Sequence, residues 1–109
     1  PNGLNILKKR SEFLTIRKLG RAIHGSHFIV NYLFSKENKL AFGLTVSKKI
    51  GNSVTRNYIK RILRHIIRKN FNLIPKKLKF EVIPKKNIEK KKFKDLETDL
   101  LKILKNLVV

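Results

Sequence analysis

The residues best suited to chemistry are basic, and four of them recur at every fourth position: Arg56, Lys60, Arg64 and Arg68. On a helix, side chains four positions apart are neighbours roughly 6 Å from one another, so these cations would form one row. No Asp or Glu lies between Glu37 and Glu81 to pair with them. Like charges at this spacing repel, whereas a phosphate backbone neutralises them and releases counterions. The row therefore predicts a surface that binds a nucleic-acid backbone. The alternative is a solvated basic helix face, although such faces usually mix both signs of charge.

A second basic feature precedes this helix. Lys48 and Lys49 follow a strand-like segment, and a turn through Gly51 leads into the helix. Free backbone N–H groups and the helix dipole favour an anion at a helix N-terminus, so we expect a phosphate there. The segment is not a nucleotide-binding P-loop, because no Gly-Lys-Ser/Thr follows a glycine at the required spacing. An ordinary strand-to-helix turn with exposed lysines is the alternative.

Aromatic side chains form a third candidate group, Phe13, Phe28, Tyr32 and Phe34. The last three lie at even spacing in one strand-like segment, which places them on one face of a sheet. Such rings can stack on unpaired bases, or they can belong to the hydrophobic core.

The acidic and histidine side chains show no catalytic pattern. The carboxylates form no obvious acid–base pair, and His24, His27 and His65 lack a metal-ligand spacing with acidic or Cys partners. Asp95 and Asp99 lie four apart but among lysines, which is typical of a solvated helix face. We therefore expect no catalytic residue and no metal site in the polypeptide.

Composition limits the class of protein. The chain has 109 residues, 27 Lys and Arg against 7 Asp and Glu, and a formal charge of +20. This length favours one domain, spanning residues 1–109, and the charge favours a polyanionic partner. Apolar residues make up 41% of the chain, enough for a folded core. With no apolar run of about 18 residues and no signal-peptide pattern, we expect a cytoplasmic protein without membrane contact.

The elements that must position these residues follow from periodicity and turn signals. We predict a helix over Glu12–Lys18, capped by Ser11 and ended by Gly20, then a short strand over Arg21–His24. Strands from His27 to Phe34 and from Lys39 to Val46 follow, with a turn at 35–38, and we expect them to pair antiparallel.

The second half begins with the basic helix, Val54 to Asn70, capped by Asn52 or Ser53. Its apolar positions share one half of the helical wheel: Tyr58, Ile59, Ile62, Leu63, Ile66 and Ile67. A strand over Leu78–Pro84 and a helix from Ile88 onward complete the order αβββαβα. The prediction is an α+β fold in a single compact domain, with helices on a mixed sheet.

The segment GLTVSKKIGNSVTRNYIKRILR, residues 43–64, closely resembles the signature of the bacterial ribonuclease P protein subunit, and LKKRSEF, residues 7–13, extends the likeness. The resemblance implies a left-handed βαβ crossover. It also implies an accessory protein of a ribonucleoprotein endonuclease that removes the 5′ leader from precursor tRNA. The partners would be the catalytic RNA and precursor tRNA, with no small-molecule substrate. Catalysis would come from the RNA, and Mg²⁺ would be held mainly by the RNA.

The same resemblance assigns residues to two RNA contacts. The catalytic RNA would contact Lys48, Lys49, Arg56, Asn57, Lys60, Arg61 and Arg64, and Arg68 continues the row. The single-stranded leader would lie in a cleft between the first helix and the sheet, where Phe13 matches the family's aromatic residue. Arg17, Phe28 and Tyr32 are further candidates for this cleft. Three positions depart from the family: Tyr58 and Ala41 stand where arginine is usual or frequent, and Arg17 where some members place a second cleft aromatic.

Two other functions are consistent with a small basic protein of this kind. A general structural RNA-binding protein, such as a ribosomal protein, would share the charge and size but would not need a leader cleft. A DNA-binding protein with a recognition helix is disfavoured, because the basic row suits backbone contacts and offers only Asn57 for reading bases.

Overall fold

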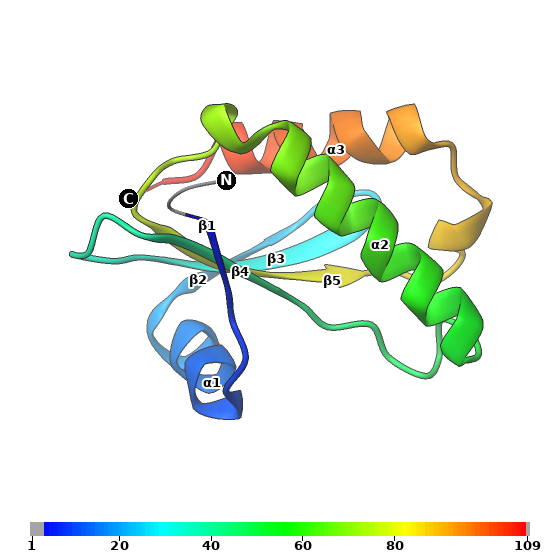
Figure 1. The fold of residues 1–109 in the computed structure, drawn as a ribbon, viewed down its shortest axis with the longest axis horizontal. Coiled ribbons are helices and arrows are strands. Elements are labelled where there is room, and N and C mark those ends of the chain that lie inside the picture. The colour runs from blue at the N-terminus through cyan, green and yellow to red at the C-terminus, as the bar shows by residue number, and fades with distance from the viewer. Residues whose placement is uncertain (1–3, 109) are drawn as a thin grey trace.

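Five strands form one mixed sheet in the order β1-β4-β5-β3-β2, as the computed structural model of the chain shows for residues 4–108 (Figure 1). The strands are β1 (Leu4–Ile6), β2 (Arg21–His24), β3 (Phe28–Phe34), β4 (Leu40–Leu44) and β5 (Leu78–Pro84). The helices are α1 (Arg10–Leu19), α2 (Ser53–Lys69) and α3 (Phe93–Lys105), with short 3₁₀ turns η1 (Phe71–Leu73) and η2 (Ile88–Lys90). The predicted α+β class is confirmed.

The predicted pairing of the β3 and β4 segments is wrong. β5 lies between them, antiparallel to β3 and parallel to β4. β5 lies in the centre of the sheet, and its residues Leu78, Phe80, Glu81 and Val82 are all at 0% exposure. The turn after β3 does not close a hairpin, because the Ser35 backbone N–H donates to Lys77 O beside β5, at 2.7 Å. α2 thus connects β4 and β5, two neighbouring parallel strands, and this is the crossover whose hand the resemblance predicts.

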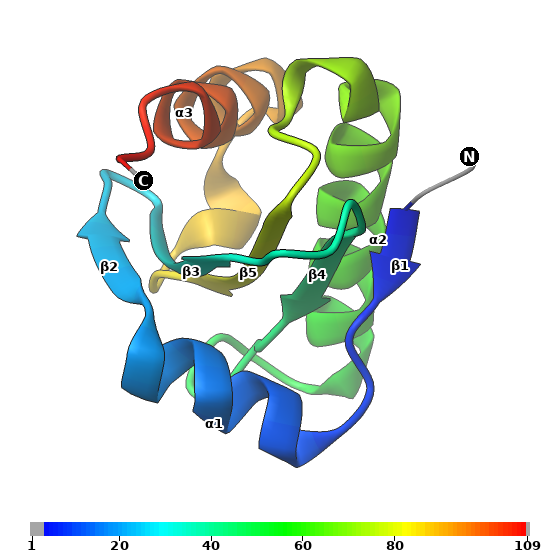
Figure 2. The same cartoon turned by 90° about the vertical axis from the view of Figure 1, so that its left-hand side faces the viewer.

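The two sheet faces carry different helices. α2 and α3 cover one face and α1 the other (Figure 2). Leu63, Ile66 and Ile67 of α2 are fully buried in the larger core. Burying each such side chain stabilises the fold by about 1.5–3 kcal/mol, which anchors α2 through one face and leaves the other face free. A smaller cluster of Leu7, Ile16 and Ala41 lies on the α1 side.

The first helix is longer than predicted and begins earlier. Ser11 is not its cap: the helix begins at Arg10, where the Lys9 backbone N–H donates to Glu12 Oε1 at 3.1 Å, so the Glu12 carboxylate does the capping. Gly20 ends the helix as predicted. A Cβ at Gly20 would lie 2.0 Å from Tyr32 O, so this position requires glycine for close packing.

Two further elements differ from the sequence prediction. β1 was not predicted, because three residues with one partly buried side chain give no periodic signal. The helix expected from Ile88 onward is interrupted: η2 spans Ile88–Lys90, Lys91 and Lys92 are extended, and α3 begins at Phe93. Asn87 has a left-handed backbone conformation with φ 69°, and the Ile88 side chain that follows it is buried in the core. Within residues 4–108, none of the helices is long and apolar enough to cross a membrane.

Candidate nucleic-acid interface

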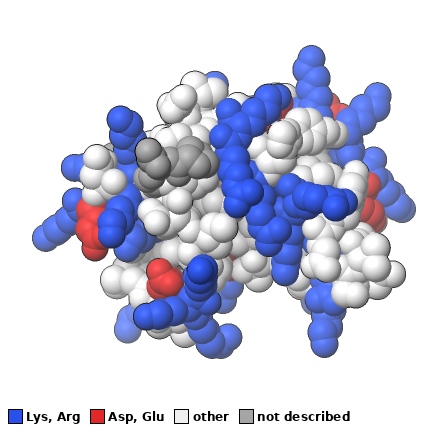
Figure 3. All heavy atoms as spheres, viewed as in Figure 1, with Lys and Arg blue, Asp and Glu red and all other residues white. Residues whose placement is uncertain are grey.

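The basic row lies along one side of α2, where Arg68 is exposed and Arg56, Lys60 and Arg64 are half-buried. Asn52 caps the helix as predicted, with its Oδ1 accepting from the Thr55 backbone N–H at 2.9 Å. Lysine and arginine side chains cross the middle of the molecular face above α2 (Figure 3). None of the ion pairs found within residues 4–108 includes a member of the row Arg56, Lys60, Arg64 and Arg68. The row therefore keeps its full charge for an external anion.

Arg56 carries a donor that the fold leaves unused. Its Nε is buried and has no hydrogen-bond partner among the described residues. A buried donor without a partner costs about 1–3 kcal/mol, and more when it is charged. An anion that reached this Nε would offset that cost.

The turn before α2 directs its two lysines outward. Val46 is buried, and the Ile50 side chain packs partly against the core, while Lys48 and Lys49 between them are exposed. The Ile50 backbone N–H donates to Ser47 O at 3.1 Å, which closes the turn. The first turn of α2 contains no acidic residue of its own, and the acid that lies beside it is Glu89 of η2, which shares a hollow with Val54 and Thr55.

On the other sheet face, a groove of about 350 Å³ lies between α1 and the end of β4, and we call it the α1 cleft. Its lining residues are Lys8, Arg10, Phe13, Leu14, Arg17, Leu44 and Thr45. The Phe13 ring packs against the Gly43 backbone, where a Cβ would lie 2.3 Å from Phe13 Cζ. The cleft thus combines an aromatic ring with several cations, which suits a single nucleic-acid strand.

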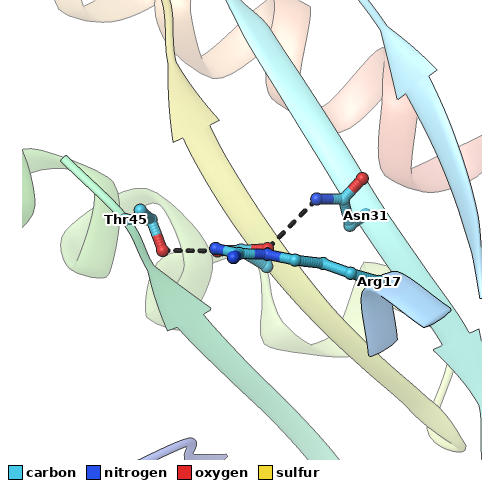
Figure 4. Close-up of polar contacts among 4 residues, drawn as sticks. Arg17, Asn31 and Thr45 are labelled. Atoms are coloured by element: carbon cyan, nitrogen blue, oxygen red, sulfur yellow. Dashed lines mark hydrogen bonds and ion pairs between the residues drawn. The ribbon is translucent and has the colours of Figure 1, made fainter. Parts of the chain in front are cut away.

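Arg17 is held in the α1 cleft by a buried carboxylate (Figure 4). Its Nε donates to Glu81 Oε1 at 2.9 Å, and its Nη2 donates to Oε2 at 2.5 Å. Asn31 Nδ2 donates to Oε1 at 3.1 Å and Thr45 Oγ1 to Oε2 at 2.5 Å. Glu81 itself is 0% exposed, so four donors surround a fully buried charge.

Burial raises the pKa of the Glu81 carboxyl, but the hydrogen bonds from Arg17, Thr45 and Asn31, together with the Arg17 charge, outweigh it and hold that pKa below its usual range. The hydrogen bond to Glu81 in turn raises the pKa of Arg17. The Arg17 side chain remains 42% exposed. Since Nε and Nη2 face the carboxylate, the Nη1 edge is available to the cleft.

Two of the predicted cleft residues lie elsewhere. Phe28 and Tyr32 are 0% and 3% exposed and belong to the core beneath α2 and α3. Their even spacing does place them on one face of β3, but it is the face opposite α1. The Tyr32 hydroxyl is also occupied, because it donates to Val108 O at 3.1 Å. Phe13 and Arg17 do lie in the α1 cleft.

Sequence reasoning missed the rest of the cleft lining, Lys8, Arg10, Leu14, Leu44 and Thr45. It also missed Asn31 and Glu81, which with Thr45 form the hydrogen-bonded cluster that holds Arg17. A signal was present for Glu81, since a lone acid within the apolar strand LKFEVIP must be buried with a partner. Nothing local pointed to Asn31 or Thr45. The chain leaves the α1 cleft at Thr45 and reaches Lys48 three residues later, so the two candidate surfaces adjoin.

The acidic side chains offer no cage for a divalent cation. Within the described part of the chain, no three His, Asp or Glu side chains gather closely enough to hold a metal ion. The arrangement of cations can bind and orient polyanions. His27 Nδ1 and Asp99 Oδ2 lie 3.1 Å apart, but this pair lies outside both the basic row and the α1 cleft.

Comparison with known proteins gives one consistent result. The family model described as Ribonuclease P matches residues 2–108. The ribonuclease P protein component of Streptococcus pneumoniae TIGR4 is 38% identical over 99 residues, 91% of this chain and 80% of that protein. The corresponding protein of Fusobacterium nucleatum is 38% identical over 107 residues, covering 94% of this chain and 96% of that one.

Solved structures agree with the sequence comparison. The ribonuclease P protein from Thermotoga maritima has a TM-score of 0.89 and 30% identity, and the match covers 96% of this chain and 99% of that chain. The ribonuclease P protein from Staphylococcus aureus has a TM-score of 0.83 and 29% identity, with 92% of each chain covered.

Proposed function

The chain belongs to the ribonuclease P protein family, and we therefore propose that it binds the catalytic RNA of ribonuclease P and supports removal of the 5′ leader from precursor tRNA. The observation that carries this proposal is the unpaired basic row of α2, preceded by the lysine turn, in a chain that matches the family over residues 2–108. Each phosphate that the row neutralises releases counterions.

The basic row would bind the phosphate backbone of the catalytic RNA. Arg56, Lys60, Arg64 and Arg68 recur at every fourth position of α2, and Lys48 and Lys49 precede the helix start. Backbone contacts of this kind fix position and orientation without reading sequence. The role of this surface is therefore to place the protein on the RNA.

The α1 cleft would hold the leader strand. Phe13 offers a ring for stacking a base, and the Arg17 guanidinium, fixed by Glu81, presents its free edge to a phosphate or a base. Because Arg17 is already ordered by the carboxylate, a bound strand would not have to immobilise it. Glu81 has no free acceptor and would act only by positioning Arg17.

No residue of this chain is assigned to the cleavage step. The RNA would supply the reacting groups, with Mg²⁺ bound mainly by RNA, since the acids of this chain are dispersed or paired. The protein would contribute charge neutralisation and a fixed path for the leader.

The test is cleavage of precursor tRNA by the cognate ribonuclease P RNA at low, near-physiological Mg²⁺, with and without the protein. Restored leader removal would support the proposal. Binding to the RNA without restored cleavage would contradict it and favour a general structural RNA-binding protein.

A further inference from the structure

A hollow of about 510 Å³ opens beside the basic row, near the N-terminal end of α2. Its lining residues are Val54, Thr55, Asn57, Tyr58 and Arg61 of α2 and Glu89 of η2. This volume lies within the range of small-ligand sites, about 300–1,000 Å³. The α1 cleft lies on the other face of the sheet, so this hollow is separate from it.

The hollow contains a flat surface suited to stacking. Tyr58 is 47% exposed although it was expected on the apolar half of the helix, and Val54 is 75% exposed. The Arg61 guanidinium lies over the Tyr58 ring, with Cζ 5.8 Å from the ring centroid. Unpaired bases of RNA stack on aromatic rings and on guanidinium planes. Exposed apolar surface within a strongly basic face therefore favours a base over a phosphate at this point.

Glu89 adds a carboxylate to the hollow, and a carboxylate favours a base that offers hydrogen-bond donors. Its Oε2 is buried and has no hydrogen-bond partner among the described residues. A buried acceptor without a donor costs about 1–3 kcal/mol or more, and the Glu89 side chain lines the hollow. A ligand with donors would relieve this cost, whereas a phosphate would be repelled.

Guanine is the base whose Watson–Crick edge carries two adjacent donors, N1–H and N2–H₂. A carboxylate can accept both, and the Asn57 amide can donate to the neighbouring O6. Adenine, cytosine and uracil each place an acceptor beside their donor, which would face the carboxylate unfavourably.

We propose that this hollow binds one unpaired guanine of an RNA, stacked on Tyr58 and Arg61 and selected by Glu89. The inference rests on the proposed function in that the partner is RNA: the phosphates on either side of the base would lie along the basic row. Base selection by this pocket adds sequence preference to a surface that otherwise contacts only the backbone.

The first experiment measures binding of labelled pentaribonucleotides UUGUU, UUAUU and UUUUU by fluorescence anisotropy at fixed salt. We expect the full chain to prefer UUGUU about tenfold, within the discrimination of one bidentate base contact. Glu89→Gln should abolish this preference, and Tyr58→Ala should weaken all three about tenfold, whereas Tyr58→Phe should not. Equal binding of the three oligonucleotides by the unaltered protein would overturn the proposal.

Glu37→Gln is the matched control, because Glu37 lies in the exposed turn before β4 and its removal changes the net charge equally. It should keep the preference for UUGUU; loss of the preference in both variants would assign the effect to net charge and refute a role for Glu89. GMP alone should compete only weakly, since it lacks the flanking phosphates. Competition by GMP at the same concentration as UUGUU would assign the site to a free nucleotide and overturn the RNA proposal.

The second experiment places the site in the assembled enzyme. Inosine lacks the N2 amino group of guanosine, and it can replace guanosine at random positions of the ribonuclease P RNA. We expect inosine at one particular position to weaken binding of the RNA to the unaltered protein. Inosine at that position should not change binding to the Glu89→Gln variant. If the protein restores cleavage but no such position exists, the guanine pocket alone is refuted. If the protein neither binds that RNA nor restores cleavage, the proposed function fails, while the pentanucleotide comparison still decides the pocket.

Discussion

Replacing Arg17 with methionine tests the buried ion pair of the α1 cleft. The change keeps the aliphatic stem and removes two of the four donors that surround the Glu81 carboxylate. A hydrogen bond to a charged group contributes about 1.5–3 kcal/mol, so two would contribute about 3–6 kcal/mol. Because the Arg17 side chain is 42% exposed, water will replace part of this. We expect a loss of about 2–4 kcal/mol at pH 7, against a total stability of about 5–15 kcal/mol.

The loss should depend on pH with a definite sign. In the unaltered protein the pKa of Glu81 is depressed, so its stabilising contribution is present above the unfolded value, about 4.3, and is lost as pH falls through the lower folded value. In Arg17→Met the burial of the carboxyl is no longer offset, and its pKa rises. The carboxyl then protonates at higher pH, and the difference in stability from the unaltered protein shrinks between pH 7 and pH 4.

Equilibrium urea unfolding followed by circular dichroism at both pH values measures these differences. Arg10→Met is the control, since Arg10 is exposed on the same helix and pairs with no acid in the described ion pairs; it should change stability by less than about 0.5 kcal/mol. Adding Glu81→Leu to Arg17→Met should recover at least half of the loss, because an apolar pair can replace a buried ion pair. A loss below about 0.5 kcal/mol for Arg17→Met, or strictly additive effects in the double variant, would refute the reasoning.

Three further outcomes are expected. Joint replacement of Arg56, Lys60 and Arg64 by alanine should weaken binding to the ribonuclease P RNA and lower the salt slope by about 2–3, with unchanged circular dichroism; an unchanged slope in the folded variant would contradict the placement. Phe13→Ala should weaken binding of precursor tRNA more than of mature tRNA in the assembled enzyme, and equal losses would count against the α1 cleft as the leader site. Gly43→Ala should have the same selective effect, since its Cβ must displace the Phe13 ring, at a cost of about 1–3 kcal/mol in stability; retained selectivity would show that the ring position does not matter.

The sequence by itself determined the local structure and the chemistry of the main surface. Three features are local in the chain: the apolar stripe of α2, its Asn52 cap and the four cations at every fourth position of the helix, in a stretch that contains no acid between Glu37 and Glu81. Residues three and four apart share a helix face whatever the rest of the fold does, so the basic row could be predicted. The signature in residues 43–64 supplied the family for the same reason: its spacing is local.

The tertiary structure alone decided which strands are neighbours and which sheet face each side chain occupies. Alternation in β3 grouped Phe28 with Tyr32 correctly but could not tell which helices would cover them. The position of β5 between β3 and β4 depends on burial across the whole sheet. The donors to Glu81 come from positions 64, 50 and 36 residues away in the chain. Contacts between residues so far apart in the chain depend on how the helices pack on the sheet, and no short-range sequence pattern predicts them.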